Sequence, residues 1–383
     1  MTRGGAQCRV TEDTAQPRHD RKRDPKLPVR KERPIEIPLT ERFDRIMASR
    51  DIPAGAGRVL GSSREGRPVP GYRFGRGPEA VSLLGGCHAD EPVGPRLLRR
   101  LAGYLAGLDA EDPMLTRHQW WIIPHINPDG ERRNAAWQDP DTDAYDLGRY
   151  LAGKVRELPG DDIEFGFPRD DADPGARPEN RAAYDWWRTC DRPFVLHASL
   201  HGMGFAAGAF FLIDRAWEDR CEALKAACRQ RAGALGYALH DVERHGEKGF
   251  FRFERGFASR PDSKRMAGHF EALGDAATAS RFWPSSMETL RSFGHDTLTL
   301  VSEMPLFILP GVGDRPGPPD PVAERWKRRI DGWRNELSAG AAPDAISAAA
   351  RNNGLVPMPV RDQMMLQWTF IAAGLRQTRV SAS

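Results

Sequence analysis

Short apolar runs alternate with segments of helical periodicity along most of this chain. The runs have the length of buried strands and lie at residues 81–86, 119–126, 193–200, 209–214 and 297–304. Apolar residues recur at helical spacing at 91–108, 179–190, 217–235, 322–337 and 361–375. Strands that alternate with helices predict an α/β fold, with a mixed, mostly parallel twisted sheet that helices cover on both faces.

The composition changes near both ends of the chain. Residues 1–34 mix charged residues, proline and glycine with almost no large apolar side chains, which predicts a disordered basic tail. A proline- and glycine-rich stretch follows residue 305, and the last two helical segments come after it. We therefore predict a single domain at residues 35–320 and a helical extension at 321–383 that docks on it.

Charge, the length of apolar runs and cysteine spacing argue against nucleic-acid binding, a membrane span and a disulfide framework. The 383 residues carry 56 basic and 53 acidic side chains, for a net charge of +3. Because residues 1–34 hold ten Lys or Arg and five Asp or Glu, the remainder is slightly acidic, which argues against a nucleic-acid-binding face. No apolar stretch reaches the roughly 18 residues of a membrane span. Five scattered cysteines without a CxxC pair indicate reduced thiols and a cytoplasmic protein.

Ionisable residues stand at the ends of three apolar runs, where open sheets of this kind place their active sites. His88 and Glu91 follow the first run and are three residues apart at the start of a predicted helix, so one metal ion could bind both. His201 follows another run and could supply a third ligand. Two imidazoles and one carboxylate form the ligand set of a catalytic zinc with an open position for water.

Five short motifs follow one another along the chain. They are His88-x-x-Glu91, NPDG at 127–130, DLGRY at 146–150, SLHG at 199–202 and SEMP at 302–305. In these motifs and in their order, the sequence from about residue 55 to 310 resembles the zinc metallocarboxypeptidases of the carboxypeptidase A type. The resemblance implies that residues 35–320 are a catalytic domain with one Zn²⁺ per chain, bound by His88, Glu91 and His201. It also implies that Glu303 is the general base.

The resemblance assigns further roles around the metal. An arginine after NPDG would stabilise the oxyanion; Arg132 and Arg133 both fit, with Asn134 beside them as a substrate-binding residue. Asp146 would orient a zinc-binding histidine, and Arg149 would bind the carboxylate of the substrate.

Two positions depart from the pattern of the family. Gly148 stands where the family has an asparagine that helps to clamp the substrate's carboxylate. Arg281-Phe282-Trp283 stands where the family has a tyrosine, so Arg281 is an alternative carboxylate reader. Glu288 lies where some members determine side-chain preference, and a carboxylate there would favour a basic side chain.

The sequence thus predicts a zinc-dependent hydrolase that cleaves an amide bond near a terminal carboxylate of a peptide or peptide-like substrate. We expect no nucleic-acid or membrane partner. One alternative is a deacylating amidohydrolase that acts on acyl amino acids, like succinylglutamate desuccinylase or aspartoacylase. NPDG in place of a GNP-type motif argues against that branch. A second alternative is a catalytically silent binding scaffold. Retention of the three metal ligands and Glu303 argues against it.

Overall fold

The computed structural model describes residues 38–49, 52–53, 55–158, 161, 163–313 and 320–380. The predicted tail at 1–34 lies outside these residues. The described residues belong to one compact unit. The boundaries proposed at residues 35 and 320 therefore stay predictions.

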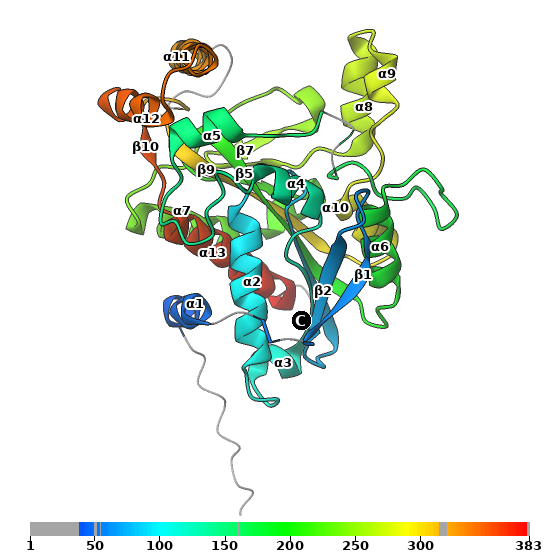
Figure 1. The fold of residues 1–383 in the computed structure, drawn as a ribbon. Helices are drawn as coiled ribbons and strands as arrows, with labels where there is room; N and C mark the ends of the chain where they lie inside the picture. The colour runs from blue at the N-terminus through cyan, green and yellow to red at the C-terminus, as the bar shows by residue number, and fades with distance from the viewer. Residues whose placement is uncertain are drawn as a thin grey trace, which may run out of the picture. The chain divides into compact units, whose positions relative to one another are not determined.

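A ten-stranded mixed sheet runs through the described part of the chain (Figure 1). Its strands, in order across the sheet, are β1 (Gly57–Ser62), β2 (Pro68–Phe74), β4 (His118–Ile123), β3 (Glu79–Gly85), β5 (Phe194–Ala206), β9 (Leu298–Ile308), β6 (Phe210–Ile213), β8 (Phe257–Ser259) and β7 (Arg252–Glu254), with β10 (Val356–Pro357) paired to β9. The four central strands β4, β3, β5 and β9 are parallel, and antiparallel pairs extend the sheet on both sides. The predicted α/β class is confirmed.

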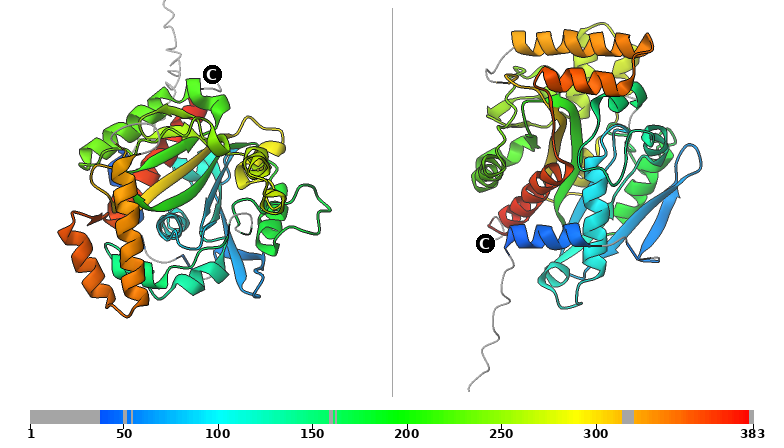
Figure 2. Two further views of the ribbon diagram at one scale, coloured as in Figure 1. Left: turned by 90° about the horizontal axis from the view of Figure 1, so that it is seen from above. Right: turned by 60° about the vertical axis from the view of Figure 1, so that its left-hand side comes forward.

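Helices cover both faces of the sheet (Figure 2). One face packs against α2 (Val93–Ala106), α7 (Glu222–Ala234) and α13 (Val360–Val380), and the other against α6 (Pro178–Arg188) and α10 (Ser286–Ser292). The remaining helices are α1 (Leu39–Ala48), α3 (Pro113–Arg117), α4 (Pro128–Asn134), α5 (Leu147–Gly153), α8 (Ser263–Ala272), α9 (Ala276–Ala279), α11 (Pro321–Ser338) and α12 (Pro343–Asn352), together with 3₁₀ turns at Arg215–Arg220 and Glu247–Gly249. Among the described residues, no helix is both long and apolar enough to cross a membrane.

Strand β5 shows how side-chain alternation separates the core from the polar face. Leu196, Ala198 and Leu200 belong to the apolar core that also contains residues of α2 and α13. Successive side chains of a strand point to opposite faces. His197 and His201 therefore face the other side, where the imidazole of His197 hydrogen-bonds to Ser286 Oγ of α10 at 2.9 Å.

All five apolar runs form strands, namely β3, β4, β5, β6 and β9. The helix predicted from residue 91 begins only at Val93, so His88 and Glu91 lie in the turn before it. Strands β1 and β2 were not predicted, because glycine interrupts β1 (GRVLGS) and proline and glycine interrupt β2 (PVPGYRF).

The last helix, α13, is part of the core. It packs on β5 and β9, and Gly374 leaves no room for a side chain, since a Cβ there would lie 2.6 Å from Leu196 Cδ1. The Gln367 side chain donates to the carbonyl oxygen of His201 at 3.3 Å and to Ser302 Oγ at 3.2 Å. Helix α13 therefore packs on the apolar face of β5 and β9, the strands that carry His201 and Glu303.

Candidate active site

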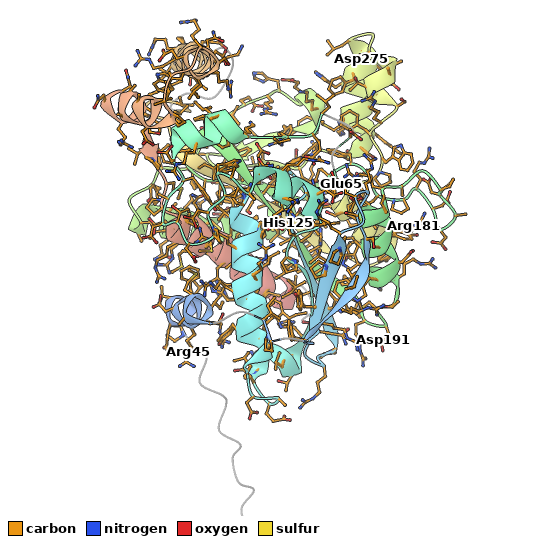
Figure 3. All side chains as sticks on the ribbon, in the orientation of Figure 1. Arg45, Glu65, His125, Arg181, Asp191 and Asp275 are labelled. Carbon is orange, nitrogen blue, oxygen red and sulfur yellow. The ribbon has the colours of Figure 1, made fainter. Side chains whose placement is uncertain are left out.

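A tight turn after β3 positions His88 and Glu91. Gly86 has a φ of 72°, and a Cβ there would lie 2.4 Å from Nδ1 of His125, so this position requires glycine. His125 is labelled near α4 in Figure 3. The amide of Glu91 donates to the carbonyl of His88 at 3.4 Å, and the turn brings His88 Nδ1 within 2.8 Å of Glu91 Oε1.

Strand register brings His201 and Glu303 together. His201 on β5 is the direct neighbour of Glu303 on β9 in the parallel pairing of these strands. Neighbouring residues of paired strands point to the same face of a sheet. Both side chains also line one cavity with His88.

The atoms of His88, Glu91 and His201 that could bind a metal converge. His201 Nδ1 lies 3.2 Å from His88 Nδ1 and 3.0 Å from Glu91 Oε2, and the three ligand atoms lie within 4.8 Å of one another. Glu91 Oε2 is buried and makes no hydrogen bond within the described structure. Two imidazole nitrogens that face each other beside such a carboxylate fit a zinc ion held between them.

Cys87, Glu164 and His201 form a second convergent group. Nε2 of His201 lies 2.8 Å from Ser199 Oγ and 3.0 Å from Glu164 Oε2, and only the Ser199 contact has hydrogen-bond geometry. Burial raises the pKa of the Cys87 thiol to about 12, so it is neutral at physiological pH. Two imidazoles and one carboxylate are the usual ligand set of a catalytic zinc, which favours the group of His88, Glu91 and His201.

The charged groups of the site shift one another's protonation. Burial opposes ionisation of Glu91, but His88, Arg156 and His201 together hold its pKa well below the usual range. Burial, and then the charge of Glu91, raise the pKa of Glu303 to about 8. A divalent cation bound nearby would favour the carboxylate form of Glu303.

A cavity of about 400 Å³ opens from these residues. Its polar lining comprises His88, Arg156, Glu157, Glu164, His201 and Glu303. Its apolar lining comprises Phe165, Leu212, Phe250, Pro261, Met266, Phe282, Met287 and Val301. The cavity therefore joins the candidate metal ligands and Glu303 to a largely apolar recess.

The arginines expected from the sequence lie elsewhere. Arg132 and Arg133 are exposed, and Arg133 pairs with Glu65 (labelled in Figure 3). Arg149 is exposed on α5. None of the three lines the cavity, which differs from the expectation that they bind substrate or stabilise an oxyanion.

Asn134 and Asp146 have structural partners instead of the expected ones. The buried Asn134 amide donates to the carbonyl oxygens of Gly130 and Val155, which ties α4 to the following loop. Asp146 caps α5: its carboxylate accepts from the amide of Arg149 at 2.9 Å and from Ser347 Oγ at 2.8 Å. No contact between Asp146 and His88 occurs among the described interactions, so the expected orienting role has no geometric support.

Three further positions singled out in the sequence also lie outside the cavity lining. Gly148 packs on α12, where a Cβ would lie 1.9 Å from Pro343 O, so its lack of a side chain is a packing requirement. Arg281 is exposed and lines a separate hollow of about 250 Å³. Glu288 closes a capping box with Ser285 at the start of α10 and also accepts from Ser263 Oγ at 2.7 Å.

Sequence reasoning missed the segment that does line the cavity. Arg156, Glu157, Glu164 and Phe165 come from the stretch between α5 and α6. Arg156 donates to Asp90 at 3.1 Å and to Glu91 at 3.0 Å, beside the candidate metal ligands. The available signal was Ile163, Phe165 and Phe167, three buried apolar residues at alternating positions in a segment rich in charged residues, proline and glycine.

The structure is that of an α/β protein in which His88, Glu91 and His201 form a candidate His₂Glu ligand set for a metal ion. Residues 57–222, which include all three candidate ligands but not Glu303, match the zinc carboxypeptidase family. This segment of the chain therefore resembles the family, as its motifs indicated. The family is zinc-dependent, and the candidate metal-binding residues are present.

Two curated relatives are carboxypeptidases. Carboxypeptidase SOL1 of Arabidopsis thaliana is 32% identical over 135 residues, which cover 33% of this chain and 24% of the relative. Carboxypeptidase D of Mus musculus is 32% identical over 183 residues, which cover 39% of this chain and 13% of the relative. The match thus spans about a quarter or less of these relatives.

Solved structures with a similar chain path include two carboxypeptidases. A metallo-carboxypeptidase of Burkholderia cenocepacia has a TM-score of 0.44 and 16% identity, with 89% of this chain and 69% of the other covered. Carboxypeptidase A of Helicoverpa armigera has a TM-score of 0.43 and 12% identity, with 90% and 71% covered.

Proposed function

We propose that this protein is a zinc-dependent hydrolase of the metallocarboxypeptidase type that cleaves an amide bond of a peptide or peptide-like substrate. The observation that carries the proposal is the shared cavity of His88, His201 and Glu303, with Glu91 completing the ligand set. One zinc ion per chain, bound by His88, Glu91 and His201, would polarise the amide carbonyl and lower the pKa of a water molecule to about 7.

Glu303 is the proposed general base. It lies beside His201 across the β5–β9 ladder and lines the same cavity, so it can reach a water molecule at the metal side of the substrate. In the reaction it would take a proton as the water oxygen bonds to the carbonyl carbon, and it would give that proton to the departing amine as the C–N bond breaks.

Arg156 is the proposed stabiliser of the charge that develops on the carbonyl oxygen. It lines the cavity, whereas Arg132 and Arg133 do not. Asp90 is 4% exposed and pairs with both Arg156 and Lys154, which fixes the guanidinium beside Glu91. A fixed cation in a partly closed site stabilises a developing oxyanion without rearrangement during the reaction.

A cytoplasmic location is part of the proposal. Cys87, Cys190, Cys221 and Cys228 are free thiols, and Cys87, Cys221 and Cys228 are buried. Reduced cysteines are typical of cytosolic proteins.

The first test combines elemental analysis of the purified protein with a hydrolysis assay on C-terminal peptides and acyl amino acids. About one zinc per chain, with activity lost on chelation and restored by zinc, would support the proposal. A protein that cannot bind zinc when it is supplied would favour a binding scaffold, and cleavage confined to acyl amino acids would favour a deacylase.

A second test is Glu303→Gln. We expect turnover to fall by about 10²- to 10⁴-fold while the zinc content stays at the wild-type level, because the base is lost and the ligands remain. Unchanged turnover in this variant would remove Glu303 from the mechanism.

A further inference from the structure

Few cationic groups line the described part of the cavity, where a carboxylate of the substrate would need them. Among its described lining residues, Arg156 is the one arginine or lysine, and it already pairs with Asp90 and Glu91. Arg149 and Arg281, the expected carboxylate readers, do not line it.

Two carboxylates face the cavity in addition to Glu303. Glu157 Oε1 accepts from the buried Asn127 amide at 2.6 Å, while its Oε2 is buried and has no hydrogen-bond donor among the described residues. Glu164 is 7% exposed, and its Oε2 has no donor of hydrogen-bond geometry, although it lies 3.0 Å from His201 Nε2. Buried acceptors without donors cost free energy that a ligand N–H can recover.

The rest of the cavity wall is apolar and partly aromatic. Phe165 and Phe282 pack edge to face with their centroids 5.3 Å apart, and Phe250 and Met266 also line the cavity. Such a wall favours an apolar or aromatic side chain of the substrate.

We propose that the departing part of the substrate carries an apolar side chain and an amino group, and that it has no free carboxylate. The amino group would donate to Glu157 Oε2 and contact Glu164, while the side chain would occupy the recess beside Phe165, Phe250 and Phe282. This inference rests on the proposed hydrolase function and specifies its substrate class.

The charges that line the cavity explain why it should prefer an ammonium group of the substrate over a carboxylate. A carboxylate brought there would lose its hydration next to two anionic groups. Among the described lining residues it would meet no arginine or lysine beyond Arg156, which is already paired. An ammonium group would be paired with the same carboxylates, so that the loss of its hydration would be compensated.

The test uses three amides that share one acyl group and differ in one substituent. The first amine portion is phenylalanine and the second is phenylalaninamide. The third is phenylalanine with an aminomethyl group in place of its carboxylate. With zinc-loaded protein, we expect kcat/KM for the aminomethyl compound to exceed that for the carboxylate by at least about tenfold, with the carboxamide in between.

Binding separates this inference from the proposed function. Dissociation constants of the three amides for zinc-loaded Glu303→Gln should follow the same order, because binding does not need the base. The expected binding order without hydrolysis by the wild-type protein would support the ligand preference and overturn the hydrolase assignment. A preference for the carboxylate, equal affinity for all three compounds, or no binding would overturn this inference.

A variant pair identifies the residue responsible. Glu157→Gln should reduce the aminomethyl-to-carboxylate ratio by at least about threefold, because one anionic partner of the ammonium group is lost. The matched control is Glu271→Gln, which removes the same charge from an exposed position of α8 outside the cavity lining. An unchanged ratio in Glu157→Gln, or an equal fall in both variants, would contradict the role of Glu157.

Discussion

The residues around the cavity are held by two regions that differ in what fixes them. His201 and Glu303 sit on β5 and β9, where the hydrogen-bond ladder of the sheet sets their relative positions. Arg156 and Glu157 sit in the connection between α5 and α6, which side-chain contacts to Asp90 and Asn127 hold in place. Strand positions therefore tolerate loss of a side chain with little movement, whereas each residue of the connection depends on its partners.

The largest expected effect is on the strand side of this comparison. His201→Ala removes one of three convergent ligand atoms, so we expect zinc affinity to fall by more than about 100-fold and hydrolysis to be lost. The backbone contact from Gln367 to the carbonyl of residue 201 remains, so the fold should persist. Zinc titration against a competing chelator measures the affinity, and circular dichroism checks that the variant is folded.

The exposed His295, outside the cavity lining, provides the control for this variant. His295→Ala should keep stoichiometric zinc. If His201→Ala also kept it, the ligand assignment would be overturned.

The second-largest expected effect concerns Arg156, in the connection between α5 and α6. Arg156→Ala should lower kcat by about 10²- to 10³-fold if the guanidinium stabilises the oxyanion. Arg132→Ala should change kcat by less than about twofold, because Arg132 is exposed and outside the cavity. Steady-state kinetics of the two zinc-loaded variants, with metal content measured in parallel, decides between them. A larger loss for Arg132→Ala would return the role to the arginines that follow NPDG.

The same difference between regions explains what the sequence could predict. The apolar runs predicted β3, β5 and β9, and the polar residues at their ends predicted the convergence of His88 and His201. Sheet geometry makes that step general, because strand ends meet at one edge. The turn that joins His88 to Glu91 was mistaken for a helix start, since both place residues three apart on one side.

The connection offers no comparable rule. In DLGRY at 146–150, the resemblance assigned Asp146 to orienting a zinc-binding histidine and Arg149 to binding the substrate. In the structure Asp146 caps α5 and Gly148 packs on α12. The Asp146 carboxylate, through Ser347, and Gly148 both also contact α12, about 200 residues further along the chain. Arg156 and Glu164 escaped notice because no periodicity marks a segment whose shape depends on individual side-chain contacts.

Gly148→Ala tests the packing role of that glycine. The new Cβ would lie 1.9 Å from Pro343 O, so α5 and α12 must move apart, and we expect a loss of about 1–3 kcal/mol in the free energy of unfolding. Urea denaturation measures it. Gly233→Ala on α7 is the matched control: nothing lies within 4 Å of its added Cβ, so helix propensity should raise stability by up to about 1 kcal/mol. Unchanged stability in Gly148→Ala would show that the α5–α12 contact can adjust.

The smallest expected effect concerns His125, which supports both the turn at Gly86 and the amide of Asn127. Burial lowers the pKa of His125 to about 4, below the unfolded value of about 6.5. The unfolded state therefore binds more protons between these values, so stability falls as pH falls from neutral toward 4. Between pH 7.5 and 6.0 this group should cost about 0.8 kcal/mol.

Protonation of His125 would also remove the acceptor at Nδ1 that receives the Asn127 amide at 3.1 Å. His125→Asn keeps an acceptor near the position of Nδ1, but the asparagine side chain does not titrate. Between pH 7.5 and 6.0 the variant should therefore lose about 0.8 kcal/mol less stability than the wild type. Urea midpoints at both pH values, with chelator present in all samples, provide the comparison, and other titrating groups cancel between wild type and variant. An equal loss of stability in both proteins would mean that His125 already ionises in the folded state, and that the turn carrying His88 tolerates a charge beside it.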